Sequence, residues 1–432
     1  MKKIRINLKN VAAIVACFAV CVTLLSGCKK EGVKKEEIKE KEPPIYGEPV
    51  ALTTNILENT ILEDLGLPVD YIITGGSFKG SSLRVGNNAT LTIMPGVTIQ
   101  FASKDGGVTI EKGATIKAIG TATKRIQFIG VENVKGAWDR IYINSATDNR
   151  FDYCDFTNGG KTGNDYTGVI TLHDAKVGIS HCKITGGLGA GVFANTWTTP
   201  CQITAFDNNV FEGFDNFAPV IFRGVNALEL VEKFDVTSNF ANNGKKYIDV
   251  APYYTKNTTI NKTTVPYRLA NSINNFRDHT LTINAGVTFY IPENTYFGGF
   301  SSGKTGRLII NGTANDKVKF TRLPGSNYYW CGVRLCDLNY AEINHAVFEY
   351  GGNNQGLTYM PVIMIDGETE VTLNNVEINY AYENGINLKD CGWKLLHNNV
   401  TFSNITGTNV IISPNSLPPN CNNALMKLNA LP

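Results

Sequence analysis

Residues 91–101, LTIMPGVTIQF, return as LTINAGVTFYI at residues 281–291, and this echo decides the fold. GTATKRIQF (120–128) returns in the same way as GTANDKVKF (312–320). Both pairs lie about 190 residues apart, so the second half of the 432-residue chain repeats the first. Long repeats made of short strands and Gly or Asn turns are typical of solenoids, in which each unit buries its apolar face against the next.

Short strands follow one another from about residue 67 to residue 413. Runs such as Val97–Ile99 and Ile126–Phe128 alternate apolar with polar residues, and this period of two predicts β-structure. The one window with helical composition, 227–234, is short and is interrupted by its own Val and Phe. We therefore expect an all-β chain with no helix.

The spacing of small residues distinguishes a coil from a sandwich or a propeller. Such residues precede inward apolar positions at 154, 182 and 209, and again at 346, 376 and 399, at intervals of 23 to 30 residues. One turn of a parallel β-helix fits this interval, since the chain returns above itself once per turn. Cys154 and Cys182 belong to this column, so we expect buried free thiols there and not a disulfide or a metal site.

Residues 1–27 read as a secretory signal peptide. Four basic residues precede an apolar run at 11–25, which is too short to cross a bilayer. The ending LSGC (25–28) resembles the lipobox of bacterial lipoproteins, which implies cleavage before Cys28 and attachment of a lipid to its sulfur. We expect an outer membrane lipoprotein, held through this lipid at the cell surface or on the periplasmic face.

A charged tether, residues 28–48, follows the signal peptide. Residues 29–42 contain six Lys and five Glu, so the segment cannot bury enough apolar surface to fold and should be a solvated spacer. Such charges also resemble the surface-export signals of some Gram-negative lipoproteins. The first repeat copy then covers residues 49–264, and the second copy with a C-terminal tail covers 265–432.

Charge excludes one class of partner. The formal net charge of +2 includes four basic and no acidic residues before Cys28, so the chain without its signal peptide has a charge of −2. Proteins that bind nucleic acid through its phosphates carry a basic stripe. We therefore expect no nucleic-acid partner.

Several phrases carry a resemblance to a known family. ATLTIMPGVTIQF (89–101), the Gly-Thr-Ala before Ile-Gln-Phe, a Trp at the next strand (Trp138 and Trp330) and a phrase ending in Gly-Gly are similar to right-handed parallel β-helix lipoproteins of the pectate-lyase-like superfold. The resemblance covers residues 67–412 and implies a right-handed coil. Its members include adhesins, glycan-binding proteins, polysaccharide lyases and hydrolases, so it leaves the function open.

The enzymatic alternative has carboxylate candidates. Asp152, Asp155 and Asp174 lie in adjacent predicted coils, with Arg150 and Lys183 near them. The family's lyases hold Ca²⁺ with several carboxylates, and its hydrolases use two or three Asp residues as acid and base. Outward carboxylates on a strand are also ordinary solvated residues, and none of the three matches a family motif. Ca²⁺ is expected only if the lyase alternative holds, and no other cofactor is expected.

Aromatic residues favour binding over catalysis. Tyr328, Tyr329, Trp197 and Tyr359 lie in predicted loops or at strand ends, where exposed rings can stack on the apolar C–H faces of sugars. Trp138 and Trp330 occur in both copies and are expected to be core residues. We predict a non-catalytic glycan-binding or adhesion module, with a polysaccharide lyase or glycoside hydrolase as the alternative and a structural envelope protein as the third option.

Overall fold

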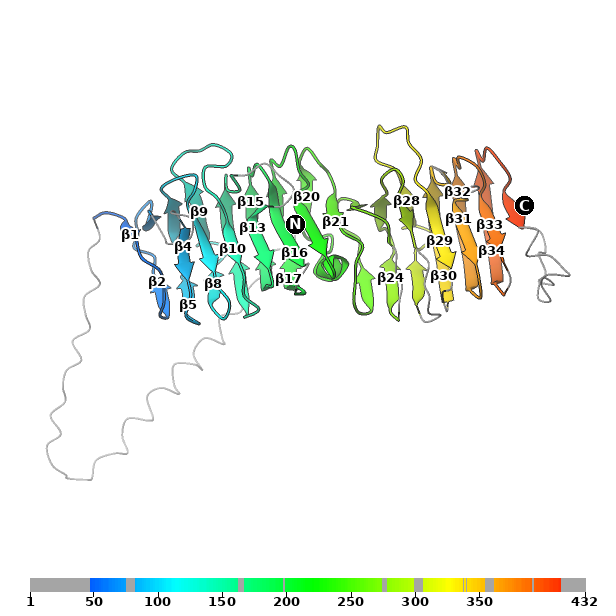
Figure 1. Ribbon diagram of the computed structural model, residues 1–432. Helices are drawn as coiled ribbons and strands as arrows, with labels where there is room; N and C mark the ends of the chain where they lie inside the picture. Colours follow the sequence, from blue (N-terminus) through cyan, green and yellow to red (C-terminus); the bar gives the residue numbers. More distant parts are fainter. Residues whose placement is uncertain are drawn as a thin grey trace, which may run out of the picture. The chain divides into compact units, whose positions relative to one another are not determined.

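The chain forms a right-handed parallel β-solenoid. The computed structural model describes residues 47–74, 82–161, 167–196, 199–273, 278–298, 306–336, 338, 340–353, 361–390 and 392–412. Residues 46–432 belong to one compact unit, and its strands lie side by side along the coil (Figure 1). In the described part of the chain, all paired strands are parallel, so the predicted all-β parallel helix is confirmed.

Three sheets form the sides of the coil in the first copy. Sheet A consists of β1 (Val50–Leu52), β3 (Tyr71–Ile73), β6 (Thr98–Phe101), β9 (Ile126–Gly130), β12 (Cys154–Thr157), β15 (Lys183–Thr185), β18 (Val210–Glu212) and β20 (Asn239–Asn242). Sheet C consists of β2 (Thr60–Leu62), β5 (Thr90–Ile93), β8 (Thr115–Ile119), β11 (Asn149–Asp152), β14 (Lys176–Ser180) and β17 (Gln202–Asp207). Sheet B begins with β4 (Ser82–Val85), β7 (Gly107–Ile110), β10 (Ile141–Ile143), β13 (Gly168–His173), β16 (Ala190–Thr196), β19 (Val220–Gly224) and β21 (Ile248–Val250).

Sheet B also includes β22 (Thr258–Ile260), near the end of the first copy, and it continues into the second copy, where a new sheet D appears. The further strands of sheet B are β23 (Tyr267–Leu269), β24 (Thr280–Asn284), β25 (Thr288–Tyr290), β27 (Arg307–Asn311), β28 (Val318–Thr321), β30 (Tyr340–Glu349), β32 (Glu370–Asn379) and β34 (Lys394–Ser403). Sheet D consists of β26 (Tyr296–Phe297), β29 (Gly332–Cys336), β31 (Ile363–Asp366), β33 (Ile386–Lys389) and β35 (Val410–Ile412).

The chain changes side where the two copies meet. In the first copy, the repeated phrases place β6 and β9 in sheet A; their counterparts β25 and β28 lie in sheet B. The crossing strand is β23, which pairs with β21 of the first copy on one edge and with β25 of the second on the other. The predicted boundary at residues 264 and 265 therefore falls in the loop before β23, and strand pairing continues from one copy to the other.

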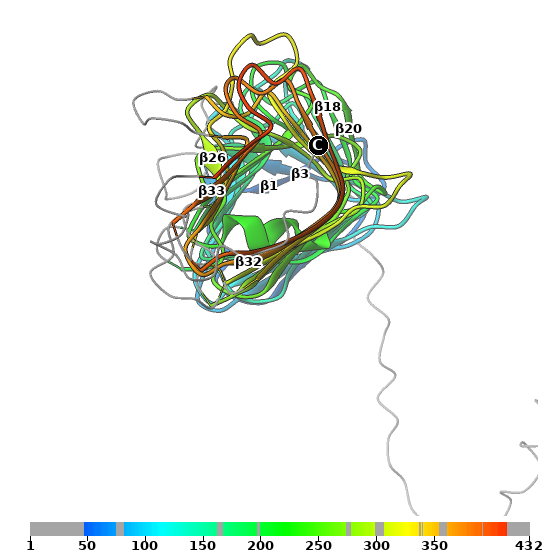
Figure 2. The ribbon, with the colours of Figure 1, turned by 90° about the vertical axis from the view of Figure 1, so that its right-hand side faces the viewer.

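A short helix fills the junction. The 3-10 helix η2 (Ala227–Lys233) lies where a strand of sheet C would continue, and it packs between β17 and β22. The expectation that window 227–234 is not helical is wrong there, because Leu228, Leu230 and Val231 face the coil interior and their burial stabilises the helix. Figure 2, a view along the coil, shows the helix in line with the side to which β32 belongs. None of the helices in the described ranges is long and apolar enough to span a membrane.

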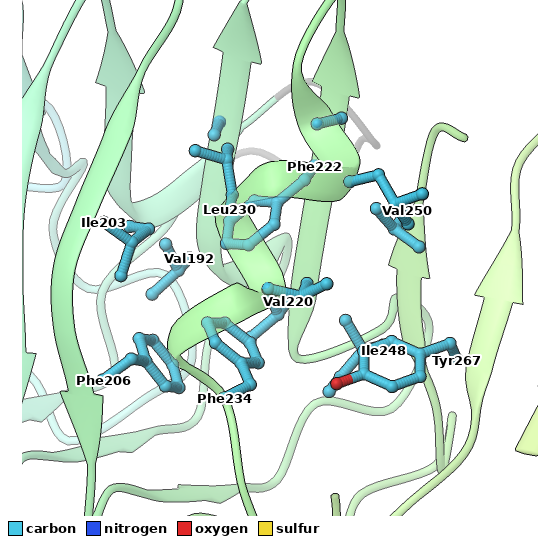
Figure 3. Packing of buried hydrophobic residues seen from close by; sticks show 14 of the residues in the cluster. Val192, Ile203, Phe206, Val220, Phe222, Leu230, Phe234, Ile248, Val250 and Tyr267 are labelled. Carbon is cyan, nitrogen blue, oxygen red and sulfur yellow. The ribbon is translucent and has the colours of Figure 1, made fainter. Parts of the chain in front are cut away.

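One apolar core runs through both copies. The buried cluster extends from Ile56 to Val400 without interruption at the junction. There, Phe234 stacks on Phe206 with ring centroids 3.8 Å apart, and Tyr267 closes the same packing from the second copy (Figure 3). Stacked inward residues on successive turns are what a solenoid needs to bury its apolar faces.

Residues with a left-handed backbone mark the corner before each inward column. Tyr153, His181 and Asn208 occupy this corner in the first copy, with φ between 49° and 53°. In the second copy the corner residues are His345, Asn375 and Asn399, with φ between 46° and 54°.

The small-residue column therefore needs one correction. The residue after the corner is buried, and on the last turn this residue is Val400, which pairs with Val376. Asn399 had been expected in the column because its Asn-Asn-Val phrase matches residues 208–210; the matching phrases are in fact offset by one position. Asn209 itself is fully buried, as expected.

Cysteines occupy the core as free thiols. Cys154 and Cys182 are at most 1% exposed and lie on neighbouring turns, which confirms the predicted buried column. Burial raises the pKa of the Cys154 thiol well above its usual value, and it raises the pKa of Cys201 to about 11. Cys28, Cys391 and Cys421 lie outside the described residues.

Candidate functional site

The side change brings residues of both copies onto one outward surface. Seven tyrosines gather over the strands from β21 to β32, and we call this surface the tyrosine strip. Its members are Tyr247, Tyr290, Tyr328, Tyr329, Tyr350, Tyr380 and Tyr382.

Arg322 lies at the centre of the tyrosine strip. Its guanidinium carbon is 3.8 Å from the ring centroid of Tyr350 and 5.6 Å from that of Tyr329. A guanidinium over an aromatic face is held by the negative charge of the ring face. One of its nitrogens, Nη1, donates a hydrogen bond of 2.8 Å to the carbonyl oxygen of Tyr328, which fixes the plane of the group.

Tyrosine rings extend from this centre along the coil. Tyr350 and Tyr380 stack with centroids 4.9 Å apart and an interplanar angle of 9°. Tyr329 contacts Tyr350 edge to face at 6.1 Å and lies 5.3 Å from Tyr382. Tyr380 and Tyr382 are 42% and 47% exposed, so large apolar ring faces meet solvent.

The backbone under two of these rings is unusual for their residue type. Tyr350 and Tyr380 have φ of 59° and 57°, a conformation that Gly and Asn adopt with little cost and bulky residues rarely adopt. In the first copy, the equivalent corners are Asn158 and Gly186. The second copy thus holds tyrosines where the first copy has the residues that fit this backbone best, and such strain concentrates at functional sites.

A cleft of about 280 Å³ opens beside Tyr350. Tyr290 and Lys319 line one part of it, and Arg322 and Ser326 line another. Burial raises the pKa of the Tyr290 phenol, so its O–H stays a hydrogen-bond donor at neutral pH. An aromatic wall with a few donors and acceptors is the usual composition of a site for small polar ligands.

Ion pairs balance most of the charge beside the strip. Lys319 lies 2.9 Å from Glu349. Arg223 and Arg268 share Asp249 at 3.2 and 3.0 Å, and Arg268 also lies 5.8 Å from the centroid of Tyr247. Arg322 has no carboxylate partner among the described residues. The strip is therefore aromatic with one stacked cation, and it does not form a strongly basic groove.

The two tyrosines predicted from sequence belong to this site with different roles. Tyr329 contributes a ring to the cluster. The Tyr328 hydroxyl accepts a 3.2 Å hydrogen bond from the Leu323 backbone N–H, so this side chain holds its own loop in place. The Tyr328 phenol also influences Tyr247 of the first copy electrostatically, although burial is the main cause that raises the pKa of Tyr247. The other two predicted ligand-binding residues, Trp197 and Tyr359, lie outside the described residues.

Sequence reasoning did not single out Tyr247, Tyr290 or Tyr350. Tyr247 and Tyr290 sit in strands or turns that look ordinary. Tyr350 had a usable signal, because the first copy reads Asn158-Gly159-Gly160 where the second reads Tyr350-Gly351-Gly352. An aromatic residue before Gly-Gly at one of two equivalent corners marks a place where the copies have diverged.

The candidate catalytic carboxylates are divided between different sides of the coil. Asp152 ends β11 in sheet C, and Asp155 lies in β12 of sheet A, beyond the corner at Tyr153. Asp174 follows β13 of sheet B, 3.7 Å from His173. Asp152 and Asp155 thus flank one corner, and Asp174 does not join them.

Local partners engage both carboxylates at this corner. Asp152 accepts a 3.2 Å hydrogen bond from Arg150 and lies 2.9 Å from the His181 Nδ1. Asp155 pairs with Arg125 at 2.7 Å and accepts a 2.8 Å hydrogen bond from Gln127. His181 lies on the corner, stacked on Tyr153 at 4.3 Å. No cluster of three or more His, Cys, Asp or Glu residues suited to a metal occurs in the described ranges.

Comparison of the chain with family models, with curated proteins and with solved structures finds no match.

Proposed function

We propose that this protein is a non-catalytic glycan-binding module of the bacterial cell envelope, and that the tyrosine strip is its sugar-contacting surface. The observation that supports this most directly is the pair Tyr350 and Tyr380. The exposed ring of Tyr380 stacks in parallel on the partly buried ring of Tyr350, and both residues have a left-handed backbone that favours Gly or Asn. A role in folding alone would be served by those smaller residues.

The chemistry of the strip suits a sugar polymer. Pyranose rings offer apolar C–H faces to aromatic rings, and their hydroxyls need donors and acceptors within reach. The strip supplies ring faces at Tyr380 and Tyr382, and the cleft at Tyr290 adds phenol, ammonium and hydroxyl groups. With most charges already paired, the ligand we propose is a polysaccharide that is bound mainly by stacking.

We further propose that the module is a lipoprotein. The support is the LSGC sequence ending at Cys28 and the charged tether of residues 28–48. A lipid on Cys28 would hold the solenoid at the outer membrane, and the solvated tether would lift it away from the headgroups. The binding strip would then be free to meet a polymer outside the membrane.

Glycan binding can be tested with one pair of matched substitutions. Tyr350→Asn introduces the residue that the first copy has at the equivalent corner, so the backbone conformation should be kept. Tyr153→Asn is the control, because Tyr153 is also a left-handed corner residue with a stacked ring, against His181, but lies outside the strip.

The soluble domain would be screened against a panel of purified polysaccharides, and affinities would be measured by calorimetry. One stacked ring contributes on the order of 1 kcal/mol, so Tyr350→Asn should weaken binding about fivefold and Tyr153→Asn should leave it unchanged. Adding Tyr329→Ala should bring the loss to about thirtyfold. Equal effects of the two Asn variants would count against the strip as the binding surface. Release of unsaturated products that Asp152→Ala abolishes would favour the enzymatic alternative.

A further inference from the structure

Tyr142 of the first copy and Tyr290 of the second lie in the same outward column of sheet B. The strand register connects them step by step from β10 to β25. The residues of this column, each paired with the next, are Tyr142, Thr171, Phe193, Ile221, Asp249, Arg268 and Tyr290.

A second cleft lies at the Tyr142 end of this column. Its volume is about 440 Å³, and Tyr142, Arg140, Asp139 and Lys161 line it together with Thr109. It thus combines an aromatic ring with cationic and hydroxyl groups, as the cleft at Tyr290 does, and it adds the carboxylate of Asp139.

The ring in the second cleft is fixed in orientation. Tyr142 is half-buried and stacks on His173 with centroids 6.4 Å apart. Burial raises the pKa of its phenol, and the nearby Asp174 raises it further, so the O–H remains a donor at neutral pH. Asp139 accepts a 3.1 Å hydrogen bond from Arg140, and Lys161 pairs with Asp105. Donors and acceptors around a fixed ring give a sugar unit both a stacking face and polar partners.

A covered apolar patch separates the two clefts. Phe193 and Ile221 are at most 3% exposed and pack with Ala190, Ala218 and the partly buried Phe217. Six strand-to-strand steps of about 4.8 Å separate Tyr142 from Tyr290, so the two rings lie about 29 Å apart along the column. A short oligosaccharide cannot reach from one cleft to the other, whereas a long polymer lying along the coil can occupy both.

We propose that the cleft at Tyr142 is a second sugar-binding site, which holds the same polysaccharide chain as the tyrosine strip. This inference rests on the proposed function of the strip. The side change at the junction aligns the two sites, since without it the equivalent strands of the second copy would continue sheet A. The ligand class that follows is an extended polysaccharide, and two-site attachment raises its affinity because the second contact forms within the complex.

The test uses the polysaccharide that binds most tightly in the panel. Binding of the intact polymer is compared with binding of oligosaccharides of increasing length cut from it. Tyr142→Ala should weaken binding of the polymer at least tenfold. The same change should leave the affinity for oligosaccharides that fill only the strip unchanged. Tyr350→Asn should weaken both ligands, and Tyr142→Phe, which keeps the ring, should retain most of the polymer affinity.

Each result decides between specific statements. A wild-type affinity that does not increase from oligosaccharide to polymer would overturn the second site and leave the strip as the sole site. An equal loss for both ligands in Tyr142→Ala, with unfolding temperature preserved, would also overturn it. If no oligosaccharide binds, or if Tyr350→Asn does not weaken the binding of any, the proposed function of the strip is contradicted instead.

Discussion

Trp138 and Trp330 each donate their indole N–H to the carbonyl oxygen of the residue nineteen positions later, Thr157 at 2.8 Å and Glu349 at 2.7 Å. Both side chains are fully buried, which confirms their predicted place in the core. Each copy therefore has the same hydrogen bond from a loop tryptophan to the end of a strand. The strand is β12 of sheet A in the first copy and β30 of sheet B in the second.

The glycine that faces each tryptophan provides a test of this packing. A Cβ on Gly159 would lie 2.5 Å from the ring of Trp138, whereas a Cβ on Gly351 would lie 3.3 Å from the ring of Trp330. Overpacking a core costs about 1–3 kcal/mol, so Gly159→Ala should lower the unfolding free energy by this amount and Gly351→Ala by much less. Thermal unfolding of the two variants measures the difference; similar losses would show that the two anchors are packed alike.

The junction should not divide the unfolding transition. Phe234 is fully buried and stacks on Phe206, in a core that continues into the second copy. Phe234→Ala should cost about 3–5 kcal/mol, as other large-to-small core changes do, while both copies still unfold in one transition. Val236→Ala, at a side chain that is 54% exposed, is the control. Two separate transitions in calorimetry, in wild type or variant, would contradict a shared core.

Stability should fall at alkaline pH. The Cys201 thiol has an ordinary pKa of 9.0, which burial raises to about 11 in the folded protein. Between these values the unfolded chain loses the proton and the folded chain keeps it, so the unfolded state is favoured as the pH rises. The contribution is at most about 3 kcal/mol, at about 1.4 kcal/mol per pH unit.

Denaturant titrations from pH 8 to pH 11 would measure this loss. Burial also raises the pKa of Tyr254 and Tyr267, so part of the slope should remain in Cys201→Ala. An unfolding free energy that is constant over this range would contradict the assignment of a buried, protonated thiol.

Binding at the strip should depend on the shape of Arg322 more than on its charge. Lys keeps the charge but loses the planar group that stacks on Tyr350, so Arg322→Lys should weaken polysaccharide binding about fivefold, or about 1 kcal/mol. Arg307→Lys, at an exposed side chain of β27, should have no effect. Wild-type binding should persist at high salt and with a chelator. A steep loss of affinity with salt would indicate an anionic ligand held by charge.

Cys28 should carry the lipid. Metabolic labelling with a palmitate analogue is expected to tag the wild type, and Cys28→Ala should remain unlabelled and unprocessed. Cys21→Ala, which removes another thiol near the proposed cleavage site, should keep the label. Labelling of the Cys28 variant would exclude this residue as the attachment site.

The sequence was sufficient to predict the strands and the inward columns, because a period of two and a recurring small residue reflect local packing. It did not reveal that β23 pairs with β21, because the repeated phrases that form β6 and β9 in sheet A recur in β25 and β28 and predict the same side for both copies. That pairing brings Tyr247 of the first copy to the strip, whose other tyrosines belong to the second copy. Tyr328 and Tyr329 could be found as loop aromatics, whereas Tyr247 becomes a neighbour of the site only through the changed side, and Tyr290 reaches it through the pairing of β25 with β28.

The side change at β23 also has an evolutionary consequence. Duplication of a gene segment usually yields two equal surfaces, and a favourable substitution in one has a ready counterpart in the other. Here the strands on the shared sheet come from different parts of the repeated unit. β21 of the first copy pairs with β23, and β23 pairs in turn with β25, which is followed by β28. Selection can therefore act on each copy's contribution to this surface separately, as the difference between Asn158 and Tyr350 at equivalent corners illustrates.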